Sequence, residues 1–557
     1  MEQPIVSQSW AANAANAINK KIGAKLADAI NEASDLKVFE PRFLEQLLAT
    51  TSSSNSNTAE QQEDASAKLL DTVIDGTRKA VMGELRKLRD GPEHSEADNK
   101  LYVEVVVRVV ASNALYRQSL RTPPPTDDDA LQQSAQSPTA SGSESFAQAS
   151  MVQASNKLVR GLLHAFEALQ QVHMQDRSHY RTAKLSKQQL SSSAETPGWD
   201  TVPLMTLVHM IQKASQTAGT AVNDEALTQI VRSWRKLLIY LQSSDNGVVQ
   251  DFSRRRGALA VVNGLIIMLF QHNNTHQCRA LLQSVEHSEQ VSETTGDVTK
   301  SVLRPAAHMI AEVVKFRYYQ GRMKLYEKKF AEAAASFSTA YRLTPPLSMC
   351  SVPQRENKLR IHFYRIVTGI VCGHEPPAAF LDVDPVSKQL FRPIIEAIRE
   401  GNPQSFCRAL DRNASLFRKR GVYMLLQQAR ILCYLYLVQR VHALVGAIPG
   451  ADNTKISVQL ILDASRLVMD VPAVDAPAVE DGQQDEGAAA DDCSPPPAKK
   501  SRMEEIVAET SGHDMDAMCL WICRLISRGF VRGYLSYEHK TLVVAKASPF
   551  PSISPPS

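Results

Sequence analysis

Residues 514–551 read DMDAMCLWICRLISRGFVRGYLSYEHKTLVVAKASPFP, and this stretch decides the fold. Its first apolar residues recur at i, i+3, i+4, i+7 and i+8, which is the spacing of one buried helix face. They are Met518, Trp521, Ile522, Leu525 and Ile526. Gly529 follows where a helix C-terminus favours positive φ, and the runs 530–536 and 541–546 flank a polar turn at 537–540. A helix followed by such a hairpin predicts the recognition helix and wing of a winged helix.

The same segment carries regularly placed cations. Arg524 and Arg528 lie four apart on one helix face, and we expect Arg532 in the first strand. Basic side chains on such a helix suit contacts with phosphates in a nucleic-acid groove. A solvated face of an assembly domain explains them equally well, so both interpretations stay open at this point.

Composition favours a helical protein with several domains. The chain has 557 residues, enough for roughly three or four domain-sized units. Aromatic residues make up 6% of it, and long stretches are rich in Ala, Leu and Gln, which favours helix over sheet. Because the net charge is only +3, any binding of nucleic acid must come from a local patch.

Cysteine usage and hydropathy predict a chain without metal site or membrane span. The eight cysteines include no CxxC pair, which favours a reducing compartment. Cys519 and Cys523 share a helix face but lack further ligands nearby, so we do not expect a zinc site. The most apolar run, 257–270, has 14 residues and contains Asn263, which predicts a buried core helix. The start, MEQPIVSQSW, lacks the pattern of a signal peptide.

The first half of the chain predicts helices interrupted by polar segments. Residues 1–121 form an N-terminal helical region with a polar linker at 51–66. Residues 122–156, dense in Pro, Ser, Thr and Asp, predict a disordered linker. Residues 157–312 then show one amphipathic or apolar segment after another, which indicates an α-solenoid.

One helix pair shows the spacing of a tetratricopeptide repeat, within a predicted helical subdomain at 313–445. Gly321 and Ala333 are the small residues that let two helices approach, Phe337 fills the gap, and Pro345 ends the second helix. Further helices are expected beyond this pair, among them one at 423–444 and one at 456–469.

The predicted winged-helix subdomain, 446–551, contains a long insertion. Composition predicts disorder at 470–512. Its first half is acidic, through Asp475, Glu480, Asp481, Asp485, Glu486, Asp491 and Asp492. Its second half contains Lys499, Lys500 and Arg502, a short cluster that is weak evidence for nuclear import.

From about residue 313 onward the chain resembles the PCI-domain proteins, in which helical repeats run into a winged helix. Within this group it is most similar to the PCI domain-containing protein 2 family, which serves the transcription–export complex 2. The stretches that carry the resemblance are YYQGRMKLYEKKFAEAAASFSTAYRL (318–343), NKLRIHFYRIVTGIVCGHEPP (357–377), EAIREGNPQSFCRALDRNASLFRKRGVYMLLQQARILCYLYLVQRV (396–441) and LISRGFVRGYLSYEHKTLVVAKASPFP (525–551). The implied fold is an all-α solenoid of tetratricopeptide-like helix pairs that ends in a winged helix with a small β-wing.

The resemblance also implies partners. Such proteins pair with a larger PCI-containing scaffold of messenger RNA export. They bind a small acidic, disordered subunit shared with the proteasome lid, and their joined winged helices form a basic surface for RNA or DNA. It further implies a nuclear protein, associated with nuclear pores, with some cytoplasmic presence and no membrane contact. An assembly subunit of a signalosome-like or proteasome-lid-like complex, without a nucleic-acid role, is the alternative.

A candidate nucleic-acid surface follows from the basic residues. Seven cations between 408 and 440 face a single acid, Asp411, and Arg418–Arg420 directly precede Gly421 at a predicted helix junction. The candidate surface comprises Arg418, Lys419, Arg420, Arg524, Arg528, Arg532, Lys540 and Lys546. A solvated basic face, or a contact for an acidic partner, is the competing interpretation. We further hypothesise that the acidic half of the insertion covers this surface and competes with nucleic acid.

No pattern in the chain predicts an enzyme or a cofactor site. His272 and His276 are four apart but lack the glutamate that a zinc protease uses as base. We expect both at the surface of a helix junction. Neither a glycine-rich phosphate loop nor a GxSxG motif occurs.

Overall fold

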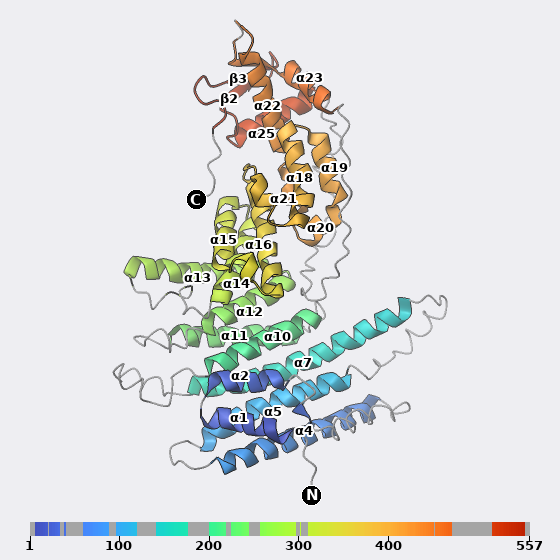
Figure 1. Cartoon of the computed structure of the whole chain (residues 1–557), viewed down its shortest axis with the longest axis vertical. Helices are drawn as coiled ribbons and strands as arrows, with labels where there is room; N and C mark the ends of the chain where they lie inside the picture. The colour runs from blue at the N-terminus through green and yellow to red at the C-terminus, as the bar shows by residue number, and fades with distance from the viewer. Residues whose placement is uncertain are drawn as a thin grey trace. The chain divides into compact units, whose positions relative to one another are not determined.

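A computed structural model of the whole chain places most of it in helices (Figure 1). The structure describes residues 6–20, 22–33, 38–39, 59–88, 96–119, 141–175, 200–218, 224–243, 257–296, 301, 303, 310–449, 452–469 and 515–551. The chain divides into two compact units, Met1–Val313 and Val314–Ser557, which are described separately below.

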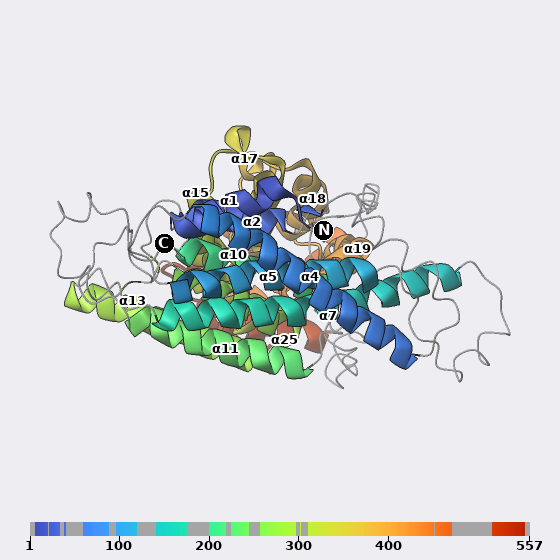
Figure 2. The ribbon, with the colours of Figure 1, turned by 90° about the horizontal axis from the view of Figure 1, so that it is seen from below.

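The N-terminal unit is a stack of helices in which sequence neighbours mostly pack on one another (Figure 2). α5 packs on α4 and α7, and α10 packs on α7 and α12. The helices of this unit are α1 (Gln8–Asn19), α2 (Gly23–Glu32), α4 (Ala59–Lys87), α5 (Glu96–Ser119), α7 (Ser141–Gln175), α10 (Thr201–Ala218), α11 (Asp224–Ser243), α12 (Ala258–Gln271) and α13 (Thr275–Thr295).

The helix α12 is the core helix that its apolar sequence predicts. Every residue from Ala258 to Phe270 is buried. Asn263, the polar residue in this run, donates from Nδ2 to the carboxylate of Glu312 at 2.7 Å and to its backbone carbonyl at 2.9 Å. His209 Nε2 lies 3.0 Å from the other carboxylate oxygen of Glu312. The amide nitrogen of this buried side chain is therefore paired with a buried acid.

Two predicted linkers are shorter than their composition indicated. α7 begins at Ser141, so residues 141–156 of the predicted linker are helical, and Ala154 is fully buried. α4 likewise begins at Ala59, inside the predicted linker 51–66. Alanine and glutamine are abundant in both segments, and they support a helix once one apolar face finds a partner. The rest of both linkers, 51–58 and 120–140, lies outside the described residues.

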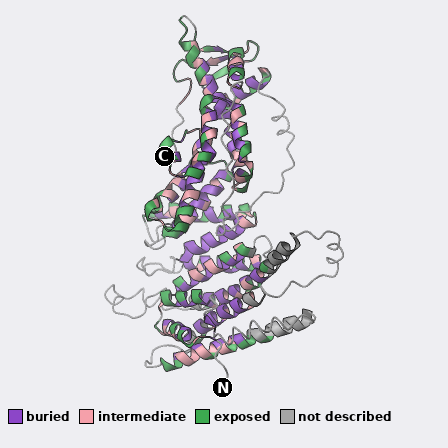
Figure 3. Cartoon of the chain, turned by 45° about the vertical axis from the view of Figure 1, so that its right-hand side comes forward, coloured by how far each residue is buried: buried purple, intermediate pink, exposed green. Residues whose placement is uncertain are grey.

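The C-terminal unit continues the helical array. It starts within α14 (Ile310–Tyr326), and its helices alternate buried and exposed faces (Figure 3). The helices that follow are α15 (Phe330–Leu343), α16 (Val352–Val371), α17 (Ala378–Leu381), α18 (Pro385–Glu400), α19 (Pro403–Arg412), α20 (Ala414–Lys419), α21 (Tyr423–Gln428), α22 (Ile431–Gly446), α23 (Val458–Met469) and α25 (Met515–Ser527), with a single 3-10 turn at Leu347–Met349.

The tetratricopeptide-like pair is α14 and α15, as the spacing predicted. A Cβ on Gly321 would meet the ring of Phe337 at 2.7 Å, so only glycine fits this contact. Phe337 is fully buried and stacks on Tyr364 of α16, with ring centroids 5.3 Å apart. Pro345 lies just beyond the end of α15. The next helix, α16, therefore packs on α15 and extends the array.

A winged helix ends the array, as predicted. β1 (Lys455–Ser457), β2 (Gly533–Ser536) and β3 (Thr541–Val544) form an antiparallel sheet in the order β1-β3-β2. The sequence missed β1, because a helix was expected to start at Ile456. Ile456 is instead paired with Leu542 and fully buried. Three residues beside a long helical pattern carry too little strand signal to be recognised before their partner strand is known.

The long insertion leaves the winged helix closed. α23 ends at Met469 and α25 begins at Met515, yet the two helices pack on each other. Residues 470–514 lie outside the described residues, so the predicted insertion 470–512 is not tested. Gly529 ends α25 with φ of 74°, and the apolar face of α25 is buried at Met518, Trp521 and Leu525.

Candidate nucleic-acid interface

The first cluster of predicted site residues lies at the turn between α20 and α21. Arg418 and Lys419 end α20, and Arg420 follows as its C-cap. Gly421 takes φ of 68°, and its amide donates to the carbonyl of Arg418 at 2.9 Å. This left-handed position reverses the chain within one residue and leaves Arg418 and Lys419 exposed. The sequence Arg-Lys-Arg-Gly therefore builds a basic corner by its own local chemistry.

Aromatic rings, and not acids, hold the arginines of this corner. The guanidinium carbon of Arg418 lies 4.8 Å from the ring centroid of Tyr423, and that of Arg420 lies 4.5 Å from the ring centroid of Phe363. Tyr364 further fixes this turn by donating its hydroxyl to the carbonyl of Arg420 at 2.9 Å. Within the described residues, neither arginine makes an ion pair. Stacking therefore orients the two cations and leaves their charge available.

A second cluster forms around Trp521 of α25. Tyr434 of α22 stacks on the indole with centroids 4.6 Å apart and an interplanar angle of 14°. The guanidinium carbon of Arg524 lies 4.9 Å from the indole centroid, and that of Arg430 lies 4.8 Å from it. Burial raises the pKa of Tyr434 to about 12, against the smaller opposing effect of Arg430. The tertiary structure thus brings together two arginines that are far apart in the sequence.

Arg430 is the residue that sequence reasoning left out of the candidate surface. One helix was expected over 423–444, but the structure breaks it between α21 and α22 and places Arg430 at the N-cap of α22. The basic run between 408 and 440 was a signal for it, yet its contact with Trp521 depends on how α22 packs on α25.

The remaining predicted residues lie around the wing and differ in whether an acid pairs with them. Arg528, Arg532 and Lys546 are exposed and make no ion pair within the described part of the chain. Arg532 lies one residue before β2 and is not part of it, contrary to expectation. Its carbonyl accepts from Ala545, the next residue in the β2–β3 register, but its amide donates outside β3, to the carbonyl of Pro549.

Lys540 is the one predicted site residue that an acid neutralises. Its Nζ lies 3.1 Å from the Asp516 carboxylate and 3.4 Å from the ring centroid of Tyr537. The Tyr537 hydroxyl donates to the same carboxylate at 2.8 Å, and this bond, followed by the one from Lys540, lowers the pKa of Asp516. Lys540 therefore fastens the wing tip to the start of α25 and is not a free cation.

Comparison with known proteins shows which sequences are similar to this chain. No protein-family model matches the chain. PCI domain-containing protein 2 of Xenopus laevis is 24% identical over 312 residues, which are 56% of this chain and 61% of that protein. The same protein of Danio rerio is 24% identical over 348 residues, 62% of this chain and 68% of the relative. The Protein CSN12 homolog of Schizosaccharomyces pombe is 25% identical over 300 residues, 54% of this chain and 56% of the relative.

These relatives are only 23–24% identical to the chain, and they support its assignment to the PCI domain-containing protein 2 family. The match spans less than two thirds of the frog and yeast relatives. Similarity to PCI-domain proteins, together with an array of helix pairs that ends in a winged helix, supports a scaffold role for this chain.

The outward face of α25 is only partly basic. Leu520 is 51% exposed and Cys523 is also exposed, whereas Cys519 is buried. The two cysteines were expected to share a face, but they lie on either side of the boundary between core and solvent. Within the part of the chain that the structure describes, no three His, Cys, Asp or Glu side chains converge on a metal site. None of the described helices is long and apolar enough to cross a membrane.

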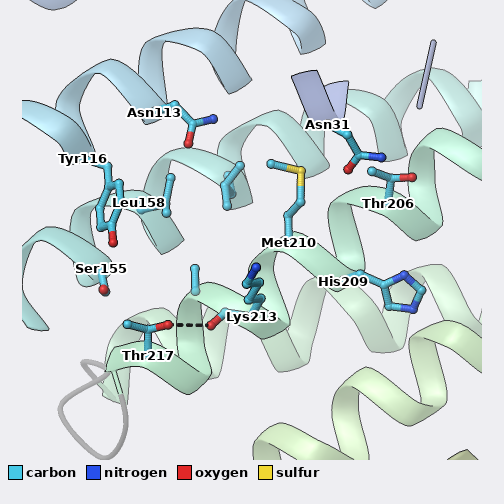
Figure 4. Close-up of a pocket in the computed structure, with 12 residues that line it drawn as sticks. Asn31, Asn113, Tyr116, Ser155, Leu158, Thr206, His209, Met210, Lys213 and Thr217 are labelled. Atoms are coloured by element: carbon cyan, nitrogen blue, oxygen red, sulfur yellow. Dashed lines mark hydrogen bonds between the residues drawn. The ribbon is translucent and has the colours of Figure 1, made fainter. Parts of the chain in front are cut away.

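The N-terminal unit also has a pocket, of about 480 Å³ (Figure 4). It lies between α5, α7 and α10, with Tyr116 and Ser155 on one side and His209 toward the other. Lys213 supplies a cation to the described lining of this pocket, and the His209 ring lies 3.0 Å from the Glu312 carboxylate. His272 and His276 do not line this pocket and lie at the α12–α13 junction. His276 is exposed, as expected, whereas His272 is half-buried.

Proposed function

We propose that this chain is a non-enzymatic scaffold and nucleic-acid-binding PCI subunit of a nuclear messenger RNA export complex that couples transcription to export. One observation carries the nucleic-acid part: four arginines rest on aromatic rings without a partner acid in the described residues. They are Arg418, Arg420, Arg430 and Arg524.

The geometry suits phosphate groups better than bases. A guanidinium that is stacked on a ring keeps its N–H groups directed outward in a planar fork, which matches the oxygens of a phosphate. Trp521 is only 9% exposed and already stacks on Tyr434, so it cannot serve as a platform for a base. Binding through such contacts depends on charge and little on sequence, and it weakens steeply with salt.

The partners and the cellular location belong to the same proposal. A larger PCI-containing export scaffold would pair with the winged helix, and a small acidic, disordered subunit would bind the helical array. RNA or DNA would contact the surface made by Arg418–Arg420, Arg430, Arg524, Arg528, Arg532 and Lys546. The work of such a complex places the chain in the nucleus, at nuclear pores, with some of it in the cytoplasm.

Charge reversal at the α20–α21 corner tests the nucleic-acid part. In the variant Arg418→Glu/Lys419→Glu/Arg420→Glu, we expect affinity for a 20-nucleotide single-stranded RNA to fall at least tenfold, because three phosphate contacts become repulsive. Fluorescence anisotropy at fixed salt measures the affinity, and circular dichroism verifies that the helical content is unchanged. RNA affinity equal to that of the unaltered chain would show that the site lies elsewhere.

An assembly subunit without nucleic-acid binding is the second candidate. The exposed Leu520 and Cys523 on α25 favour it, because a helix that reads a nucleic-acid groove presents polar side chains there. Purification of the tagged chain from cells, followed by mass spectrometry, separates the candidates. Export-complex subunits among the co-purifying proteins support the first, and subunits of a deubiquitinating complex support the second.

A further inference from the structure

The outward face of α11, in the N-terminal unit, has a composition that its own fold does not explain. The inward face, with Ile230, Trp234 and Leu237, is fully buried. A second apolar row nevertheless runs along the outside, where Leu227, Val231 and Ile239 recur at multiples of four residues. Ile239 is 69% exposed. In the view of Figure 2, α11 lies at the edge of this unit.

Cations accompany this outer row. Arg235 occupies the missing position in it, between Val231 and Ile239, and Arg232 and Lys236 lie one residue further along each turn. All three cations are exposed, and none makes an ion pair within the described residues. Arg235 donates to the side-chain oxygen of Gln277 at 2.9 Å, a neutral partner. The outer face of α11 therefore presents three charges and a broken apolar row.

The opposite wall of this surface comes from α12 and the first turn of α13. Leu269, Asn274 and Gln277 complete a groove of about 560 Å³, and none of the side chains that the structure describes in its lining is acidic. Asn274 caps α13 by accepting from the Gln277 amide, so the positive end of a 21-residue helix also faces the groove. The neighbouring acid, Glu167 of α7, bonds to Gln229 and is not part of the lining.

We infer that this groove binds an acidic amphipathic helix of a partner protein. A row of side chains at i+4 spacing is the ridge on which a second helix packs, and apolar anchors at i, i+3 or i+4, and i+7 would cover Leu227, Val231 and Ile239. Acidic side chains on the flanks of that helix would meet Arg232, Arg235 and Lys236.

Two other occupants fit the groove less well. A nucleic acid would satisfy the three cations but would leave Ile239 exposed, and the described lining of the groove offers no aromatic ring on which a base could stack. A second copy of the chain, packed symmetrically through this face, would place the same three cations opposite one another. An acidic amphipathic helix would cover Ile239 and would also place opposite charges beside the three cations.

An unbiased peptide selection tests this inference with the full chain. A displayed library of random 20-residue peptides is selected on the unaltered chain and depleted on the variant Arg232→Glu/Arg235→Glu/Lys236→Glu. We expect the enriched peptides to be acidic, with apolar residues at helical spacing. The most enriched peptide, fluorescently labelled, should bind that variant at least tenfold more weakly than the unaltered chain. It should bind Ile239→Asp, which changes only the apolar row, more weakly by a similar factor.

Matched controls decide between the occupants. Lys157→Glu/Arg160→Glu reverses two exposed charges on α7, and peptide affinity should stay within twofold. The inference is overturned if the enriched peptides are neutral or basic. It is also overturned if they bind the α11 variants as tightly as the unaltered chain. Displacement of the peptide by an equimolar 20-nucleotide RNA overturns it as well. A gain of affinity on deletion of residues 471–512 would likewise overturn it, because the chain's own acidic segment would then be the occupant.

Discussion

Gly321 shows how one missing side chain fixes the packing of two helices. Its Cα faces the ring of Phe337 so closely that an added Cβ would come within 2.7 Å of it. That ring cannot move away easily, because Tyr318 and Tyr364 pack against it. The close approach of α14 and α15, from which α16 then continues, therefore depends on this glycine.

We predict that Gly321→Ala destabilises the C-terminal unit relative to Gly369→Ala. Both positions are helical, so both variants gain the same intrinsic helix propensity. At Gly369 the nearest atom to the new Cβ is 3.9 Å away, so nothing must move. Overpacking at Gly321 should make its variant less stable by about 1–3 kcal/mol in this comparison. Amide hydrogen exchange of α15 and α16 in the full chain measures the difference, and equal exchange rates would contradict the prediction.

Tyr434 gives the Trp521 cluster a dependence on alkaline pH. Because the pKa of Tyr434 is raised to about 12 from 10.0, the folded chain keeps its proton where the unfolded chain loses it. This contribution to stability is complete below pH 10 and is lost as pH rises toward 12. In that interval the unaltered chain should lose about 1.4 kcal/mol of unfolding free energy per pH unit more than Tyr434→Phe.

Urea denaturation of both proteins at several pH values between 9 and 12 measures this difference. The phenylalanine keeps the stacking on Trp521, so it serves as a matched partner without the ionisable group. Parallel pH profiles for the two proteins would show that the Tyr434 hydroxyl does not titrate differently in the folded state.

At the scale of elements, the winged helix tolerates a long interruption because its contacts are not local. α23 and α25 are separated by 45 residues, yet they pack together and share the sheet whose outer strands are β1 and β2. The wing is additionally tied to α25 through Asp516. The insertion thus enters and leaves at neighbouring helix ends of one compact subdomain.

Deletion of residues 471–512 should leave this subdomain folded and strengthen RNA binding. By the hypothesis made from the sequence, the acidic half of the insertion competes with nucleic acid, so the deletion takes away a tethered competitor for the basic surface. We expect a several-fold gain in affinity at low salt that disappears near 0.5 M salt, measured by anisotropy with single-stranded RNA. Unchanged affinity and unchanged salt dependence would rule out competition by the insertion.

At the scale of the whole molecule, the net charge does not predict where nucleic acid would bind. The chain carries 62 basic and 59 acidic residues, yet within the described part of the chain Lys540 is the one cation of the candidate interface that makes an ion pair. Binding should therefore follow the local surface and not the net charge.

Two measurements check this expectation. If four to six phosphates are neutralised, log K should fall with log salt with a slope of about −3 to −4 for single-stranded RNA. Lys157→Glu/Arg160→Glu lowers the net charge from +3 to −1 but should change RNA affinity less than twofold. A loss as large as that of the Arg418–Arg420 variant would indicate unspecific attraction by the chain as a whole.

The sequence by itself determined the features that local chemistry specifies. Periodic apolar residues defined the helix α25 and the buried helix α12, Gly529 marked a helix end, and the small residues around Phe337 identified the helix pair. The basic corner at Arg418–Arg420 was also visible, because a run of cations before a glycine builds its own turn.

Only the tertiary structure decided the rest, because long-range contacts leave no periodic trace in one chain. β1 exists through its pairing with β3, and Arg430 joins Arg524 only because α22 packs on α25. Lys540 looked like a free cation until Asp516 lay beside it. Helix propensity and turn chemistry act over a few residues, whereas these three outcomes depend on which distant side chains the fold brings together.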